Sequence, residues 1–125
     1  MNTLTKMTEA ILAFRDARDW KQFHNPKDAA ISLTLEANEL LEFMQWRNGE
    51  ELKSHLAKHS EGVGDELADV LYWTLLLAHD HGIDLEAAFE RKMAKNAAKY
   101  PVEQARGSSL KYHELKRASR EKEGE

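Results

Sequence analysis

The sequence lacks cysteine and has few residues that break helices. Without a single Cys among its 125 residues, the chain cannot form disulfides, thiolate zinc sites, iron–sulfur clusters or a cysteine nucleophile. It contains only two prolines and six glycines. Neither a Gly-x-Gly-x-x-Gly nor a Gly-x-x-x-x-Gly-Lys motif occurs, which excludes the Rossmann and P-loop nucleotide sites.

An excess of basic charge and long apolar runs are also missing. Lys and Arg number 18 against 22 Asp and Glu, a net charge of −4, which argues against a general nucleic-acid-binding protein. The amino terminus shows no secretion signal, and the densest apolar run, residues 67–78, is shorter than the ~20 residues of a membrane span. We expect a soluble cytoplasmic protein that binds neither nucleic acid nor membrane.

What the sequence does contain favours an all-α fold. Ala, Leu, Glu and Lys dominate, and alternating runs of β-branched residues are absent. The predicted helices cover residues 5–18, 28–47, 51–58, 65–79 and 85–99, the second capped by Asp28 or a neighbour and the last by Asp84. We predict one domain over residues 1–110, a four- to five-helix antiparallel bundle completed by oligomerisation, and a charged disordered tail over residues 111–125.

Two pairs of acids differ from ordinary surface acids because apolar residues surround them in the sequence. On a helical wheel at ~100° per residue, Glu36 and Glu39 lie at the border between the apolar arc and the solvated face of the second helix. In the fourth helix, Asp69 is the only charge within residues 67–78, and Glu66 lies one turn earlier on the same face. Removing an ionised carboxylate from water costs several kcal/mol unless a counter-charge is present. The position of Asp69 therefore predicts a counter-charge beside it.

Two such pairs on neighbouring helices can bring four carboxylates into one cleft. The acids would raise each other's pKa values and repel, and a divalent cation would relieve that repulsion. Ligands that are all oxygen select Mg²⁺ or Mn²⁺ over zinc. The alternative is that each acid pairs with a Lys or Arg or caps a helix.

Basic and aromatic residues suggest a phosphorylated ligand that carries a base. Lys92, Asn96 and Lys99 share one sector of the last helix and could neutralise a triphosphate, although lysines there also complement the helix dipole. Trp20 and Trp46 could stack on a base, with core or oligomer packing as the alternative. His55 and His59 have zinc-compatible spacing but no third ligand, so we predict that they are surface residues.

Taken together, these residues resemble a known family. Glu36-Ala-Asn-Glu39 followed by Glu66-Leu-Ala-Asp69 resembles the signature of the all-α nucleoside triphosphate pyrophosphohydrolases, and more narrowly the MazG-like branch that includes dCTP pyrophosphatase. Further similar strings are Arg18-Asp19-Trp20-Lys21-Gln22-Phe23-His24-Asn25-Pro26, Phe43-Met44-Gln45-Trp46, Lys92-Met93 with Asn96 and Lys99-Tyr100-Pro101, and residues 105–112. The resemblance spans about residues 7–112.

The resemblance implies Mg²⁺-dependent hydrolysis of a (deoxy)nucleoside triphosphate, dCTP or a related pyrimidine, to a monophosphate and pyrophosphate. It implies a homodimer or homotetramer with shared sites. The residues it implies are Glu36, Glu39, Glu66 and Asp69 for the metal, with Glu36 or Glu39 as catalytic base; Lys92, Asn96, Lys99 and Tyr100 for the phosphates; and Trp20, Phe23, His24, Trp46 and Trp73 for the base. Trp73 stands four residues after Asp69, where the dCTP branch tends to carry a tyrosine; here the tyrosine, Tyr72, is displaced by one.

Two other functions stay open at this point. A non-catalytic helical oligomerisation or interaction module would use the acids only as surface charge. A pyrophosphohydrolase of another substrate, such as a phosphoribosyl compound or a dUTP-type nucleotide, would keep the metal site, although the aromatic loop around Trp20 favours a base.

Overall fold

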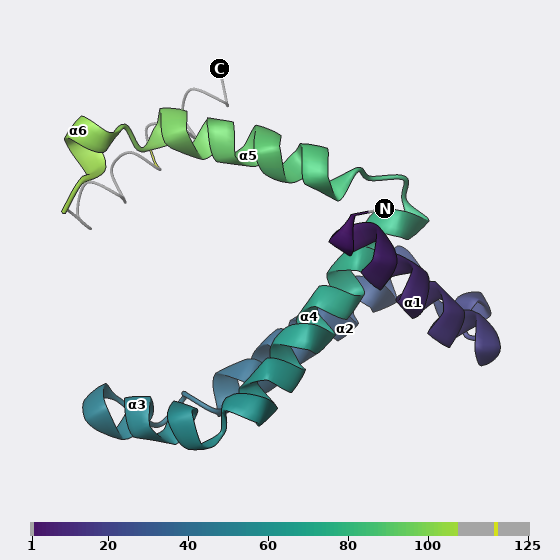
Figure 1. Ribbon diagram of the computed structural model, residues 1–125, viewed down its shortest axis with the longest axis horizontal. Helices are drawn as coiled ribbons and strands as arrows, with labels where there is room; N and C mark the ends of the chain where they lie inside the picture. Colours follow the sequence, from purple (N-terminus) through teal and green to yellow (C-terminus); the bar gives the residue numbers. More distant parts are fainter. Residues whose placement is uncertain (1, 108–116, 118–125) are drawn as a thin grey trace. The chain divides into compact units, whose positions relative to one another are not determined.

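The chain is helical and has no strand among residues 2–107 and residue 117, which the computed structural model describes (Figure 1). The described elements are α1 (Thr3–Ala17), the 3-10 helix η1 (Lys21–Phe23), α2 (Pro26–Glu42), α3 (Gly49–Lys58), α4 (Ser60–Asp80), α5 (Leu85–Lys99) and α6 (Val102–Ala105). The all-α prediction is confirmed. The tail predicted over residues 111–125 lies, apart from residue 117, outside the described residues.

Short polar side chains start the helices. The Asn25 side chain accepts the N–H of Asp28 at 2.9 Å, and Pro26 occupies the first turn of α2, where its missing N–H costs nothing. The cap of the second helix is thus Asn25 and not Asp28. Asp84 caps α5 as predicted and accepts the N–H of Ala87 at 3.0 Å.

The contacts divide the chain into two compact units, residues 1–83 and 84–125. Helices α1–α4 belong to the first unit, and α5 and α6 belong to the second. Among the described residues, no helix combines the length and apolarity needed to cross a membrane. The single domain over residues 1–110 stays a prediction.

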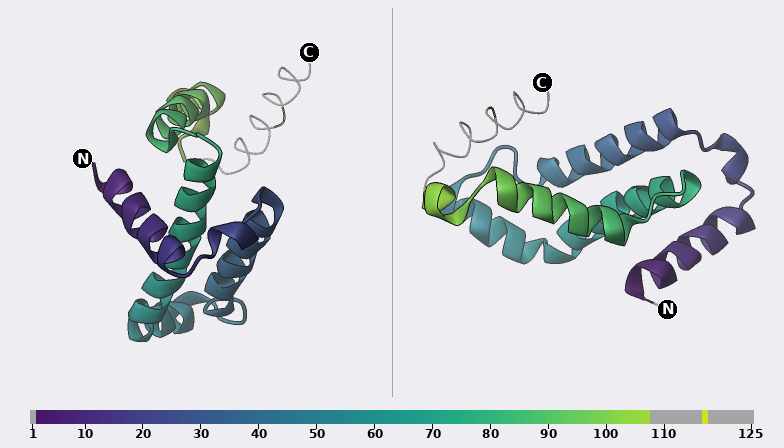
Figure 2. Two further views of the ribbon diagram at one scale, coloured as in Figure 1. Left: turned by 90° about the vertical axis from the view of Figure 1, so that its right-hand side faces the viewer. Right: turned by 90° about the horizontal axis from the view of Figure 1, so that it is seen from above.

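In the first unit, α4 is the central element. It lies antiparallel beside α2 and packs most extensively against it, while α1 contacts α4 on another side and α3 meets its beginning (Figures 1 and 2). The most deeply buried apolar side chains are Ile11, Ala29, Leu75, Leu76 and Ala78. Helix α1 is therefore attached to α4 at the carboxyl-terminal half of α4.

One face of α2 turns inward, and an acid lies in the middle of it. The buried and half-buried side chains that recur at helical spacing on this face are Ala29, Leu33, Glu36, Leu40 and Phe43. Glu36 is thus part of the inward face, not of its border as the wheel predicted, whereas Glu39 is exposed. The amino-terminal half of α4 is partly open: Leu67 is 52% exposed, and Asp69, which the sequence placed in an apolar run, is exposed as well.

Two helix ends differ from the predicted ones. α2 ends at Glu42, not at residue 47, and α4 begins at Ser60, five residues earlier than predicted. Phe43 leaves α2 and its ring lies against α4, so that a Cβ added to Gly62 would meet the ring Cζ at 2.9 Å. Position 62 of α4 therefore requires glycine, because a larger side chain there would compete with the Phe43 ring for the same space. Gly64 has no such neighbour, since nothing lies within 4 Å of its Cβ position.

We predict opposite outcomes for alanine at these two glycines. Gly64→Ala should stabilise the protein by about 0.5–1 kcal/mol, because alanine is the better helix former and meets no obstacle. Gly62→Ala should lose that gain, because the new methyl group displaces the Phe43 ring. Urea denaturation of the two variants beside the unmodified protein measures this; equal stabilisation by both would contradict the packing of Phe43 on α4.

Candidate functional site

Three of the four predicted carboxylates meet in the structure. Glu36 and Glu39 of α2 and Glu66 of α4 each offer an oxygen, and these oxygens all lie within 4.8 Å of one another. The close antiparallel packing of α2 and α4 brings them together, because Glu36 and Glu66 stand half-buried where the two helices touch. Such spacing matches a shared hard cation better than independent surface charges.

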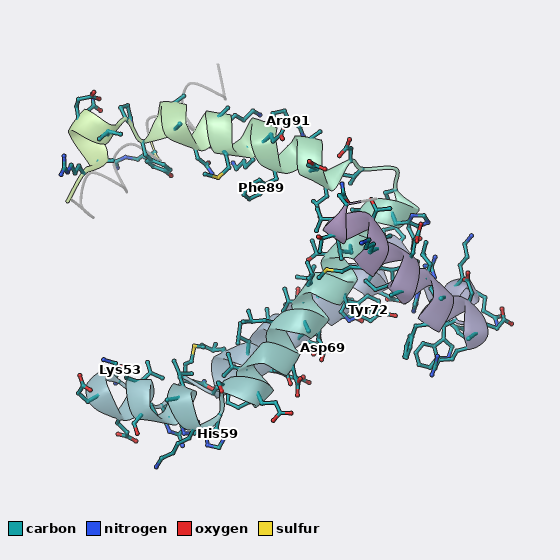
Figure 3. All side chains as sticks on the ribbon, viewed as in Figure 1. Lys53, His59, Asp69, Tyr72, Phe89 and Arg91 are labelled. Atoms are coloured by element: carbon teal, nitrogen blue, oxygen red, sulfur yellow. The ribbon has the colours of Figure 1, made fainter. Side chains whose placement is uncertain are left out.

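The fourth carboxylate, Asp69, lies beside this cluster. It is one turn beyond Glu66 on α4, and its charge is among those that raise the pKa values of Glu36 and Glu66. Together with Glu36, it also lines a cavity of about 570 Å³. Figure 3 shows Asp69 and Tyr72 projecting from the same side of α4.

Like charges and burial disfavour ionisation of the cluster. Burial is the largest cause that raises the pKa of Glu36, to about 7, and the hydrogen bond and charge of Glu39 add to it. Burial, followed by the hydrogen bond and charge of Glu39, likewise raises the pKa of Glu66. The metal-free site therefore holds more protons near neutral pH than separate glutamates would.

Within the described part of the chain, no basic group offsets these charges. None of the four carboxylates forms an ion pair with Lys, Arg or His there. One carboxylate oxygen of Glu36 and one of Glu66 are inaccessible to solvent and have no hydrogen-bond partner. Because buried polar atoms are rarely left without a partner, the residues fit a divalent cation bound by oxygen.

The cavity beside Glu36 and Asp69 has mostly aromatic walls. Its lining residues come from α1, α2, α4 and the loop between α1 and α2: Ala10, Ile11, Phe14, Trp20, His24, Glu36, Asp69, Tyr72 and Trp73. A volume of about 570 Å³ is in the range of ordinary small-molecule sites. We call this space the aromatic cavity.

Edge-to-face contacts fix the rings of the aromatic cavity. The Phe14 ring lies 5.7 Å from Trp20 and 6.3 Å from Tyr72, and His24 lies 5.4 Å from Trp73. The Nδ1 atom of His24 is buried without a hydrogen-bond partner. The aromatic cavity thus offers flat, largely apolar walls.

A second cavity, of about 370 Å³, opens on the other members of the cluster. Glu39, Glu42, Phe43, His55 and Glu66 line it. His55 is half-buried, unlike the predicted surface residue, whereas His59 is exposed as predicted; the two ring centres lie 4.3 Å apart. We call this space the acidic cavity.

Other predicted site residues are not brought to either cavity. Phe23 is 65% exposed and Trp46 is 81% exposed, and neither lines the aromatic cavity. The predicted phosphate residues belong to the second unit, where Lys92, Asn96 and Lys99 lie on α5 and Tyr100 follows its last residue. Their roles, and the role of Trp46, stay predictions.

Sequence reasoning missed several residues that line the cavities. Phe14 looked like ordinary core because it continues the apolar spacing of α1 from Ile11. Tyr72 follows Asp69 by three residues and so shares its side of α4, a signal that was available. Glu42 and His55 gave no signal, because only the turn after α2 brings α3 close to the cluster.

Comparison with known proteins places the chain in a family. The model of the MazG-like family matches residues 31–115, which include all four acids. The chain therefore belongs to the MazG-like family.

Individual relatives agree with this assignment. The chain is 35% identical over 119 residues to dCTP pyrophosphatase 1 of Rattus norvegicus, which covers 94% of this chain and 70% of the relative. It is 36% identical to dCTP pyrophosphatase 1 of Homo sapiens over 115 residues, 90% of this chain and 68% of the relative. A solved structure of a pyrophosphatase from Archaeoglobus fulgidus superposes with a TM-score of 0.76 at 35% identity, covering 81% of this chain and 94% of that one.

The raised pKa of Glu36 predicts how stability depends on pH without metal. Between pH 4.5 and about 7, the folded protein binds more protons than the unfolded chain, so the free energy of unfolding falls as pH rises through this window. Thermal unfolding in EDTA from pH 5 to pH 8 measures the fall. Excess Mg²⁺ should reduce it, because the cation binds the ionised carboxylates of the folded state.

Two variants test the origin of this dependence. Glu36→Gln should flatten the pH profile, because the amide cannot titrate, whereas Glu61→Gln on the exposed first turn of α4 should leave it unchanged. A profile that Glu36→Gln does not alter would mean that the cluster does not hold the extra protons.

Proposed function

We propose that the protein is a Mg²⁺-dependent hydrolase that converts a pyrimidine deoxynucleoside triphosphate, dCTP or a close relative, to its monophosphate and pyrophosphate in the cytoplasm. One observation carries the proposal: carboxylates of α2 and α4 meet at the wall of the aromatic cavity, where Glu36 and Asp69 stand beside Trp20 and Trp73. A cation site and a stacking site are thus adjacent, as a nucleotide requires.

The similar proteins support the class of reaction. The curated relatives are named dCTP pyrophosphatase 1, and the similar solved structure is named a pyrophosphatase. The chain is accordingly a nucleoside triphosphate pyrophosphohydrolase. An interaction module without activity would have no need for half-buried acids that lack basic partners.

The metal is assigned to the four carboxylates. Glu36, Glu39, Glu66 and Asp69 would hold Mg²⁺, with Mn²⁺ as a substitute, since all the donors are oxygen. When bound, the cation supplies Lewis-acid polarisation of phosphoryl oxygens and favours ionisation of water.

The chain's own residues would provide the base and hold the charge. Glu36 or Glu39 accepts the proton of the attacking water, whose oxygen bonds to the α-phosphorus. The bond from that phosphorus to the bridging oxygen breaks, and pyrophosphate leaves with the electron pair. Lys92, Asn96, Lys99 and Tyr100 are the residues we propose for the phosphates, because cations stabilise the charge that develops on the leaving group.

The base is assigned to the aromatic cavity. Trp20 and Trp73 provide faces for stacking. These walls favour a nucleotide over a phosphoribosyl substrate without a base. Phe23 and Trp46 are exposed, so a role in base binding would require further ordering or a second subunit.

We propose that the protein is a homodimer or homotetramer. Large apolar side chains stand exposed on α2 and α4 of the first unit, among them Ile31, Leu35, Leu67 and Leu71. Burial of these side chains against further copies would add to the small core of a single chain.

A panel of nucleoside triphosphates tests the reaction. With Mg²⁺, the purified protein should release a monophosphate and pyrophosphate, most rapidly from a pyrimidine deoxynucleotide. Glu39→Gln and Asp69→Asn should each lower kcat by at least about 100-fold with the helical content preserved, because each removes a charge that the cation needs. The measurement is separation of products by ion-exchange chromatography, with circular dichroism as the check of folding.

Matched controls lie on α4. Asp65→Asn and Glu61→Gln make the same chemical changes at exposed positions of α4 outside both cavities, and activity should be retained. Release of orthophosphate alone, or full activity of Asp69→Asn, would contradict the proposed reaction or the proposed ligand.

Tryptophan variants test the base site. Trp20→Ala should raise KM about tenfold while changing kcat by less than about threefold, because a stacking contact is worth ~1–3 kcal/mol. Trp46→Ala should raise KM only if a second subunit places Trp46 at the site. Sedimentation velocity should then give the mass of two or four chains; an active monomer with an effect of Trp46→Ala would contradict the shared site.

A further inference from the structure

The most deeply buried charge among the described residues belongs to Arg15 of α1, and no step proposed above uses it. Only 2% of Arg15 is exposed. Its guanidinium donates two hydrogen bonds to the Asp80 carboxylate of α4, from Nη1 to Oδ2 at 2.8 Å and from Nη2 to Oδ1 at 3.1 Å. This fork-to-carboxylate geometry fixes both distance and orientation between the two helices.

Asp80 occupies a place where an acid is otherwise unfavourable. It is the last residue of α4, and a negative charge at the carboxyl end of a helix opposes the helix dipole. Burial of the Asp80 carboxyl raises its pKa, yet the hydrogen bonds and charge of Arg15, with smaller contributions from His79 and His81, lower the pKa overall. The ion pair is therefore maintained, and it anchors the carboxyl-terminal end of α1 to the end of α4.

The anchored end of α1 carries a wall of the aromatic cavity. The carbonyl oxygen of Arg15 accepts the backbone N–H groups of Arg18 and Trp20, each at 3.2 Å. The Arg18 guanidinium lies 3.8 Å from the centre of the Phe14 ring, which in turn contacts Trp20 edge-on. Thus Asp80 is connected to Trp20 by one ion pair, one residue and one backbone hydrogen bond.

Neither member of the ion pair reaches the cavity itself. Phe14 and Trp20 line it, whereas Arg15 and Asp80 do not. The contact can therefore affect a ligand only through the place it gives to the rings. A change there should alter how well the rings fit a base and should leave the carboxylates of α2 and α4 where they are.

We infer that Arg15 and Asp80 are positioning residues for substrate binding: their ion pair holds the turn after α1 so that Trp20 and Phe14 form the wall of the aromatic cavity next to Tyr72. The inference rests on the proposed function, in which that cavity receives the base. It assigns to the pair an effect on nucleotide affinity beyond its effect on stability.

The test uses conservative variants of the full-length protein. Arg15→Lys keeps the charge but loses the two-pronged geometry, and Asp80→Asn keeps the shape but loses the charge. Each should raise KM for the best triphosphate of the panel about tenfold and change kcat by less than about threefold, because the rings move but the metal ligands do not. The double variant should raise KM no further than the more affected single variant, since both changes break the same contact.

A core variant separates positioning from simple loss of stability. Leu75→Val removes one methylene from a buried side chain of α4 that lines neither cavity. It should lower the melting temperature while KM stays within about twofold of the unmodified protein.

Each outcome of the test is informative. If Arg15→Lys and Asp80→Asn leave KM unchanged, or if KM changes in Leu75→Val to the same degree, the inference is wrong while the proposed function stands. If Asp80→Asn does not fold, Arg15→Lys decides. An unmodified protein that hydrolyses no triphosphate would instead overturn the proposed function, and the inference with it.

Discussion

Repulsion between carboxylates at the contact of α2 and α4 is the constraint on which the rest of the site depends. Glu36 and Glu66 occupy half-buried positions where leucine would pack better, and each keeps a buried oxygen without a partner. Glu39 stands close enough to raise both pKa values. A fold that needed only a core would gain by replacing these acids, and their arrangement fits a cation bound by oxygen between the two helices.

The charges of Asp80 and Glu66, at two places on α4, are balanced in different ways. At the carboxyl end, Asp80 has a protein partner, and its pair with Arg15 is complete within the chain. Farther toward the amino end of α4, the charged groups that shift the pKa of Glu66 are other acids. The pair of Arg15 and Asp80 anchors α1, whereas, in the part of the chain that the structure describes, the acids around Glu66 lack a positively charged partner, which a bound cation would supply. Tyr72 and Trp73, the two rings of the aromatic cavity that belong to α4, lie between these two points.

The helices and the identity of the acids could be predicted from the sequence because they depend on local features. Asp84 and Pro101 bound α5, and the spacing of Glu66 and Asp69 puts both on one side of α4. The end of α2 could not be predicted, because it depends on the Phe43 ring finding space at Gly62, nineteen positions later. Likewise, His55 joins the acidic cavity only through the turn that precedes α3. Such contacts between segments leave no periodic signal.

The spacing of the acids also explains why the cluster borders two different cavities. Residues three apart on a helix differ by about 60° in direction and by about 4.5 Å along the helix axis. Because α2 and α4 are antiparallel, the order of the acids along one helix is reversed on the other, so that Glu36 comes level with Asp69 and Glu39 with Glu66. Asp69 and Glu36 therefore meet the aromatic cavity, while Glu39 and Glu66 meet the acidic one. A nucleotide whose base lies between the rings would approach the cation from the side of Asp69, and its direction across the site follows from the antiparallel packing.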